Sequence, residues 1–174
     1  DHRGREAEYR KTQAAYRENR QKSSDAEKAL RDLQESAQAL TQLVRALERK
    51  TPYRGPAVPL AQAGHSLPWP AEGRVAVPYG RTQVPSLGTT FIQQGIRMAT
   101  ARGAPVRPVK DGKVIFAGSF RSYGQVLIVD HGQGFYTVYG LLGEPLKKKG
   151  DAVTPADILG TAGQSSPGTS SGDA

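Results

Sequence analysis

The chain has 174 residues, of which 37% are hydrophobic, which is enough for one modest core. Its net charge of +8 is divided between the first 50 residues and the rest without a dense basic patch, which argues against a nucleic-acid partner. The chain contains no Cys, so disulfides and thiolate zinc sites are excluded, and no apolar run approaches the ~20 residues that a membrane-spanning helix needs.

The first segment, residues 1–51, is expected to be a helical coiled coil. Residues 5–50 contain no Pro or Gly and are rich in good helix formers, and apolar residues recur at the a and d positions of a heptad. Toward the N-terminus the same positions are mostly polar or Tyr, so the first half is expected to need a partner helix. Two interpretations stay open: an intermolecular or hairpin coiled coil, or an amphipathic helix docked on its own domain. The predicted seam consists of Leu30, Leu33, Ala37, Leu40, Val44 and Leu47.

A linker and a β domain follow the helix. Thr51-Pro52 disfavours further helix, and residues 52–66 are rich in Pro, Gly and Ala, which predicts a linker. Residues 67–174 contain short β-rich runs separated by Gly, which predicts an all-β domain with antiparallel strands. The sequence GQG at 132–134 is typical of a hairpin turn between two of these strands.

Four blocks of the β region, in this order, carry a family resemblance. They are LPWPAEGRV, GIRMATARGAPVRPVKDGKVIFAG, YGQVLIVDHGQGFYTVYGLL and KKKGDAVTPADILGTAG. Together they resemble the LytM-type zinc metallopeptidases, and more closely the degenerate branch of EnvC-like murein hydrolase activators. The resemblance implies a LytM-like antiparallel sheet with a groove.

The resemblance also locates the family's zinc and catalytic positions, and none of the well-aligned ones keeps its chemistry. Gln93 stands where active members carry a zinc-binding His, Arg97 stands at the zinc-binding Asp, and Leu141 stands at the catalytic His. The last motif would begin near Ala174, so the domain is expected to be incomplete at its C-terminal end. A guanidinium repels a cation and an alkyl side chain cannot move a proton, so we expect no metal, no cofactor and no hydrolysis.

Three further features of the β region receive a structural or a binding role. Tyr139 is the expected groove aromatic, because alternation would place it on the same strand face as Leu141. His131, at the end of a strand, is expected to make a structural hydrogen bond rather than bind metal. The run Lys147, Lys148 and Lys149 is expected to be a solvated turn.

The function implied by the resemblance is that of a non-catalytic activator of peptidoglycan N-acetylmuramoyl-L-alanine amidases. The implied location is the periplasm, where such a protein acts in cell-wall remodelling and daughter-cell separation, and its coiled coil would respond to an FtsEX-like division complex. The partner would bind the vacated groove at Gln93, Arg97, Tyr139 and Leu141. A peptidoglycan-binding module without hydrolase activity is the alternative, and an endopeptidase with unconventional ligands is a third interpretation.

Overall fold

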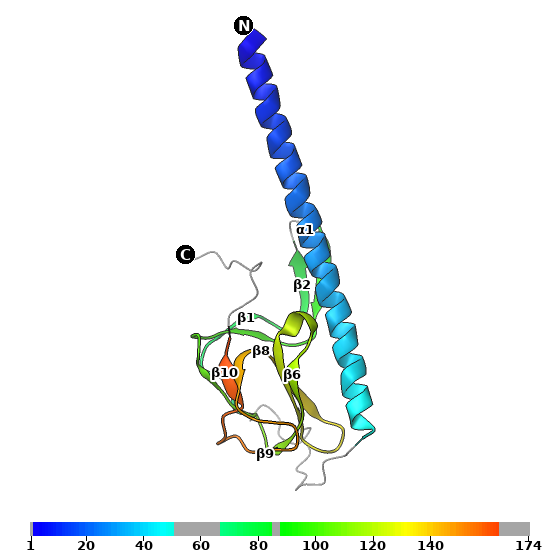
Figure 1. Ribbon diagram of the computed structural model, residues 1–174, viewed down its shortest axis with the longest axis vertical. Coiled ribbons are helices and arrows are strands. Elements are labelled where there is room, and N and C mark those ends of the chain that lie inside the picture. The colour runs from blue at the N-terminus through cyan, green and yellow to red at the C-terminus, as the bar shows by residue number, and fades with distance from the viewer. Residues whose placement is uncertain (1, 51–66, 85–87, 164–174) are drawn as a thin grey trace.

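The computed structural model describes residues 2–50, 67–84 and 88–163, and it begins with one long helix (Figure 1). Helix α1 spans His2–Glu48, 47 residues, so the predicted helix is confirmed. Beyond it, the Lys50 N–H donates a hydrogen bond to the Leu47 carbonyl (3.0 Å). The predicted linker, residues 52–66, lies outside the described residues. Within those residues, no helix combines the length and the apolar character that crossing a membrane requires.

The C-terminal part of α1 packs on the β domain. Its side chains Leu40, Leu43, Val44 and Leu47 contact a cluster whose buried members are Ile115, Val126 and Ile128. By contrast, Tyr9 and Tyr16 are 65% and 67% exposed, and Figure 1 shows the N-terminal part of α1 extending beyond the β domain. The interpretation of a helix docked on its own domain therefore describes the C-terminal part. A coiled coil is not confirmed and stays a prediction.

The β domain is built on an antiparallel six-stranded sheet whose long central strands are joined by tight connections. The hairpin turn predicted at 132–134 joins β7 to β8 and is confirmed, and the 3₁₀ turn η2 (Arg121–Tyr123) joins β6 to β7. The strands, in spatial order, are β5 (Pro105–Val106), β10 (Gly160–Ala162), β8 (Tyr136–Pro145), β7 (Gln125–Asp130), β6 (Gly112–Ser119) and β9 (Ala152–Val153).

Two short antiparallel pairs precede this sheet. Strand β1 (Arg74–Val77) pairs with β4 (Arg97–Ala99), and β2 (Gly80–Val84) pairs with β3 (Thr89–Gln93). Because β2 and β3 lie between β1 and β4 in the chain, the two pairs form one interrupted two-stranded ribbon, which we call the β1–β4 ribbon. The predicted β domain with antiparallel strands is thus confirmed.

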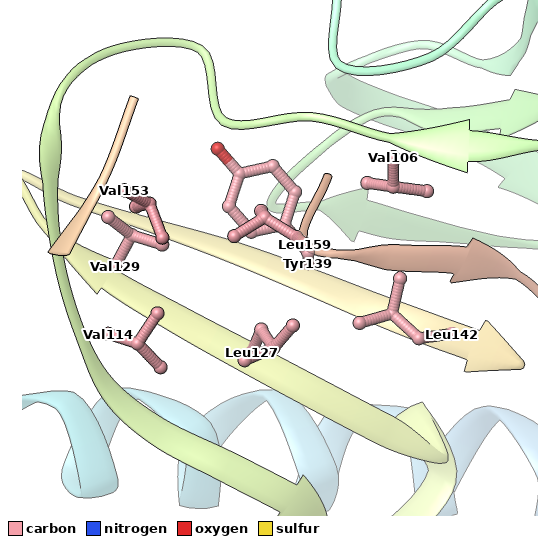
Figure 2. Close-up of a cluster of buried hydrophobic side chains, with 8 residues drawn as sticks. All are labelled: Val106, Val114, Leu127, Val129, Tyr139, Leu142, Val153 and Leu159. Carbon is pink, nitrogen blue, oxygen red and sulfur yellow. The ribbon is translucent and has the colours of Figure 1, made fainter. Parts of the chain in front are cut away.

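The two faces of the six-stranded sheet carry two separate apolar clusters. Strand β7 supplies both by alternation: Leu127 and Val129 point into one cluster, and Val126 and Ile128 into the other. Figure 2 shows the first cluster, on the side of the sheet away from α1. We call the side that contacts α1 the outer face. The first cluster consists of Val106, Val114, Leu127, Val129, Tyr139, Leu142, Val153 and Leu159.

The packing of α1 predicts different effects for two leucines of the same helix. Leu43 contacts the outer face but does not belong to the heptad seam, whereas Leu33 belongs to the seam and is 41% exposed. Placing a carboxylate at the packed contact should cost more than about 2 kcal/mol of the free energy of unfolding. We expect Leu43→Asp to lower the denaturation midpoint and Leu33→Asp to leave it nearly unchanged.

Urea denaturation and sedimentation velocity of both variants check this expectation. If Leu33→Asp destabilises the protein as much as Leu43→Asp, and also lowers its sedimentation coefficient, a coiled coil through the seam dominates and the docking account is wrong.

Candidate functional site: the vacated zinc positions

Gln93 and Arg97 lie on either side of a short turn in the β1–β4 ribbon. Gln93 ends β3 and pairs with Gly80, while Arg97 begins β4 and pairs with Val77. Both side chains are half-buried. Only the turn at residues 94–96 separates the two positions that the resemblance assigns to zinc ligands. The fold thus brings the two predicted positions to one turn of the ribbon.

Leu141 occupies a bulge in β8. Tyr139, two residues earlier, pairs with Leu127, and Leu142 pairs with Gln125. Gly140 and Leu141 therefore lie together opposite Val126 of β7. Leu141 has a positive φ of 57°, a conformation that costs a non-glycine residue on the order of 1 kcal/mol. Its carbonyl accepts a hydrogen bond from the Gly163 N–H (3.0 Å). Leu141, which the resemblance places at the catalytic His, is therefore a strained point opposite Val126 of the outer face.

Tyr139 lies in the apolar core and not on an open surface. It is 8% exposed, and Figure 2 shows its hydroxyl pointing toward the segment before β6. The bulge changes the alternation, because Leu142 and not Leu141 shares the core cluster of Tyr139. The expectation that Tyr139 and Leu141 share a face is wrong for this physical reason. Tyr139 is therefore a core residue and offers a partner little surface.

A hydrogen-bonded chain links Tyr139 to His131. Val109 N–H donates to the Tyr139 hydroxyl (3.2 Å), and the hydroxyl oxygens of Tyr139 and Thr137 lie 3.0 Å apart. His131 Nε2 lies 2.7 Å from the Thr137 hydroxyl, and Nδ1 lies 2.8 Å from the Asp111 carbonyl. Because a carbonyl only accepts, Nδ1 carries the proton and the neutral ring offers Nε2 to Thr137. His131 thus makes the structural hydrogen bonds that its position in the sequence predicts.

Burial sets the protonation of this chain. His131 is 3% exposed, and loss of solvent lowers the pKa of its imidazole below the ordinary value. The Asp111 carbonyl and the Asp130 carboxylate oppose this effect, while Lys110 adds to it. Burial also raises the pKa of Tyr139, so its hydroxyl keeps its proton. The chain is therefore neutral and holds the end of β7 against β8.

The side chains at the three vacated positions do not fit a zinc ion. They supply an amide at Gln93, a guanidinium at Arg97 and an alkyl group at Leu141, whereas zinc in proteins takes imidazole, thiolate or carboxylate ligands. A fixed positive charge at Arg97 also repels a cation. In the described ranges, no three His, Cys, Asp or Glu side chains are gathered as metal ligands.

Exposed apolar side chains adjoin the vacated positions, and the sequence reasoning missed them. Ile92, next to Gln93, is 60% exposed, and Ile96, next to Arg97, is 47% exposed. Tyr79, which precedes the partner of Gln93, is 73% exposed. We call Ile92, Gln93, Ile96 and Arg97 the ribbon patch. The available signal in the sequence was the two isoleucines that stand next to Gln93 and Arg97.

A shallow hollow of about 340 Å³ opens near the other side of the bulge. It is lined by Arg102, Gly103, Gly143, Thr161, Ala162 and Gly163, and none of the four residues predicted for the groove belongs to it. The link to the predicted site is the hydrogen bond from Gly163 to Leu141. The hollow therefore adjoins Leu141 without containing any of the four predicted residues.

Comparison with known proteins supports the family resemblance drawn from the sequence. The model of peptidase family M23 matches residues 91–173, which include all three vacated positions. This match supports a peptidase M23 (LytM-type) domain in the β region, as the four sequence blocks predict. A crystal structure of an M23 protein from Pseudomonas aeruginosa superposes with a TM-score of 0.54 at 25% identity, covering 78% of this chain and 51% of that one.

Two curated relatives of this M23 domain differ in what their names describe. The chain is 32% identical over 90 residues to the DD-carboxypeptidase/endopeptidase Mpg of Neisseria meningitidis, covering 52% of this chain and 21% of the relative. It is 30% identical over 98 residues to the murein hydrolase activator EnvC of Escherichia coli, covering 55% and 22%. The chain thus spans about a fifth of the length of each. The predicted relationship to LytM-type domains and murein hydrolase activators is confirmed.

The buried imidazole predicts a pH dependence of stability. A His with a lowered folded-state pKa stays neutral in the fold while the unfolded chain takes up a proton, so stability falls as pH drops below about 6.5 and levels off below the folded pKa. We expect the wild-type denaturation midpoint to fall between pH 7 and pH 5. His131→Gln should be less stable at pH 7 but should lose this dependence.

His2→Gln is the matched control, because His2 is exposed on α1 and its replacement should leave the pH profile unchanged. Urea denaturation at several pH values measures both variants. An unchanged slope in His131→Gln would show that another group controls the profile.

Proposed function

We propose that this M23 domain is a non-catalytic activator of peptidoglycan amidases in the bacterial envelope. The observation that carries the proposal is the replacement of zinc chemistry at three positions by Gln93, Arg97 and Leu141 in a framework that keeps its strands and turns. The similarity to a protein named murein hydrolase activator supports it. A domain without metal ligands that keeps its strands and turns still offers a surface to which another protein can bind.

The similarity to a DD-carboxypeptidase/endopeptidase favours hydrolysis instead, and the two interpretations differ at the site. An M23 hydrolase needs a metal ion and a group that moves a proton. Gln93 is a weak ligand, Arg97 carries a fixed positive charge, and Leu141 has no proton to transfer. An enzyme that uses these residues would require a different mechanism, so the activator interpretation has the stronger support.

The ribbon patch and Leu141 form the proposed binding surface for the amidase. Arg97 provides a planar guanidinium that suits a carboxylate, and Ile92 and Ile96, which are next in sequence to Gln93 and Arg97, provide exposed apolar area. We assign the half-buried Leu141 to the same surface because the sequence resemblance places it in the same groove. Arginine is enriched among the residues that dominate protein–protein binding, which favours a protein segment over a sugar chain.

The rest of the proposal concerns the helix and the location. The exposed N-terminal part of α1 is suited to contact another protein, and we assign to it the FtsEX-like division complex that the resemblance implies. The protein would then act in the periplasm during cell-wall remodelling and daughter-cell separation. The similarity to a murein hydrolase activator is consistent with a role in cell-wall remodelling, and the division complex is proposed from the sequence resemblance alone.

A peptidoglycan-binding module is the second candidate, favoured by the net charge of +8. Stem peptides of peptidoglycan carry carboxylates, which a basic surface attracts. Binding to purified sacculi, compared with binding to a purified amidase at the same ionic strength, separates the two functions. An activator should bind the amidase much more tightly, whereas a wall-binding module should bind sacculi and lose them as salt is raised.

The side chains of Gln93, Arg97 and Leu141 predict that the isolated protein neither binds zinc nor cuts peptidoglycan. Metal analysis of the purified protein should give far less than one zinc per chain, and dye-labelled sacculi should release no dye. A known active M23 endopeptidase serves as the positive control for both assays. One equivalent of zinc together with dye release would end the proposal.

The binding surface predicts the effect of a double substitution. Arg97→Glu with Leu141→Asp reverses a charge and removes apolar area, and the loss of such anchors typically costs ~2 kcal/mol or more of binding free energy, roughly thirtyfold in affinity. We expect the folded double variant to lose stimulation of the amidase in a dye-release assay. Leu141→Asp is also measured alone by circular dichroism, because Leu141 is half-buried.

Lys148→Glu is the matched charge reversal, since Lys148 is exposed in the turn after β8. This control should stimulate the amidase as the wild type does. Full stimulation by a folded double variant and loss of stimulation by Lys148→Glu would place the binding surface at the lysine turn instead.

A further inference from the structure

The buried polar contact of α1 is with the 3₁₀ turn η2. Ser36 is 3% exposed, and its hydroxyl oxygen lies 2.5 Å from that of Ser122 in η2. The Ser122 hydroxyl also lies within 3.5 Å of the Asp32 carbonyl, one turn earlier in α1. A helix rises about 1.5 Å per residue, so a hydroxyl pair is satisfied at one helix position only, whereas leucine contacts tolerate small shifts. The Ser36–Ser122 contact therefore fixes α1 along η2.

The opposite side of η2 lies on the bulge of β8. A Cβ added to Gly140 would lie 3.5 Å from the Tyr123 Cβ and carbonyl oxygen, and one added to Gly124 would lie 3.9 Å from the Leu141 Cα and Cδ2. The turn is closed by two hydrogen bonds, from Phe120 N–H to the Gly124 carbonyl (2.9 Å) and from Tyr123 N–H to the Phe120 carbonyl (3.0 Å). These two bonds make η2 one compact unit. A displacement of η2 at its contact with α1 would therefore also displace the residues that contact the bulge.

Leu141 is the residue on this contact path whose backbone conformation is strained. Its φ of 57° is a conformation that a leucine keeps only when its surroundings enforce it. The bulge lies opposite Val126, whose side chain belongs to the cluster that α1 covers. Removing the support from η2 therefore leaves the leucine free to relax to an ordinary conformation.

We propose that α1, through the Ser36–Ser122 contact and η2, holds the bulge at Leu141 in its strained conformation, so that displacement of α1 alters the surface that binds the amidase. The consequence for the amidase rests on the proposed function, whereas the coupling is a property of this chain alone. A partner that acts on the exposed N-terminal part of α1 would reach the site by this path. The regulated element is the bulge itself.

Amide hydrogen exchange of the full chain tests the coupling without any partner. Gly163 N–H donates to the Leu141 carbonyl, so its exchange reports on the bulge, and the exchange of Phe120 N–H reports on η2. In Ser36→Ala and in Ser122→Ala, both amides should exchange about threefold to thirtyfold faster. The double variant should exchange no faster than either single variant, because both remove the same contact.

Thr41→Ala is the matched control, since the Thr41 hydroxyl is exposed and donates only to the Ala37 carbonyl of its own helix (3.0 Å). It should leave the exchange of Gly163 unchanged. The coupling is overturned if Ser36→Ala speeds exchange in α1 but not at Gly163, or if Thr41→Ala has the same effect as Ser36→Ala.

Stimulation of a purified amidase, measured in parallel, tests the consequence. Both single variants should raise the concentration for half-maximal stimulation by about threefold or more, and Thr41→Ala should not. A wild-type protein that stimulates no amidase would contradict the proposed function, while the exchange of Gly163 would still decide whether α1 controls the bulge.

Discussion

The packing of α1 on the outer face of the six-stranded sheet is the contact on which the rest of the structure depends. The central strand β7 points apolar side chains to both faces, so each face needs a cover. The first cluster is closed within the β domain, and the second is closed by leucines near the end of α1. Without the helix, Val126 and Ile128 would face water. The helix is thus part of the fold and not merely an appendage.

The same arrangement keeps the core of the β domain separate from the predicted zinc positions. The cluster around Leu127 is apolar, and its one hydroxyl, on Tyr139, belongs to the hydrogen-bonded chain that ends at His131. None of the vacated positions Gln93, Arg97 and Leu141 belongs to this cluster. Substitution there removes chemistry without removing buried apolar contacts, which supply most of the folding free energy. Selection for a binding surface could then act on the exposed side chains of the ribbon patch.

Much of the fold could be predicted from residue patterns, and the exceptions have identifiable physical causes. A stretch of 46 residues, 5–50, without Pro or Gly predicts the helix, and Gly-separated β runs predict the sheet. A heptad pattern, however, describes an apolar stripe and does not say what covers it. Leu43 was missed because it lies outside the a and d positions, although it contacts the sheet.

The identity of the candidate site stays a prediction, and its local geometry could be predicted only in part. The motif spacing locates Gln93, Arg97 and Leu141, because the glycines and tyrosines of the motif fix the alignment. The bulge at Gly140 and Leu141 is set by pairing with β7, a contact distant in sequence, so simple alternation misplaced Tyr139. The exposure of Ile92 and Ile96 likewise depends on which elements leave the ribbon uncovered.

The central claim is that the partner binds where the zinc chemistry was lost, and site-specific photo-crosslinking tests it most directly. A photoreactive amino acid placed at Ile96, which is 47% exposed, is compared with one at Lys148, which is exposed in the lysine turn. With a purified amidase that the protein stimulates, the account predicts a crosslink from position 96 and none from position 148. A crosslink from position 148 and none from position 96, with stimulation intact, would contradict it.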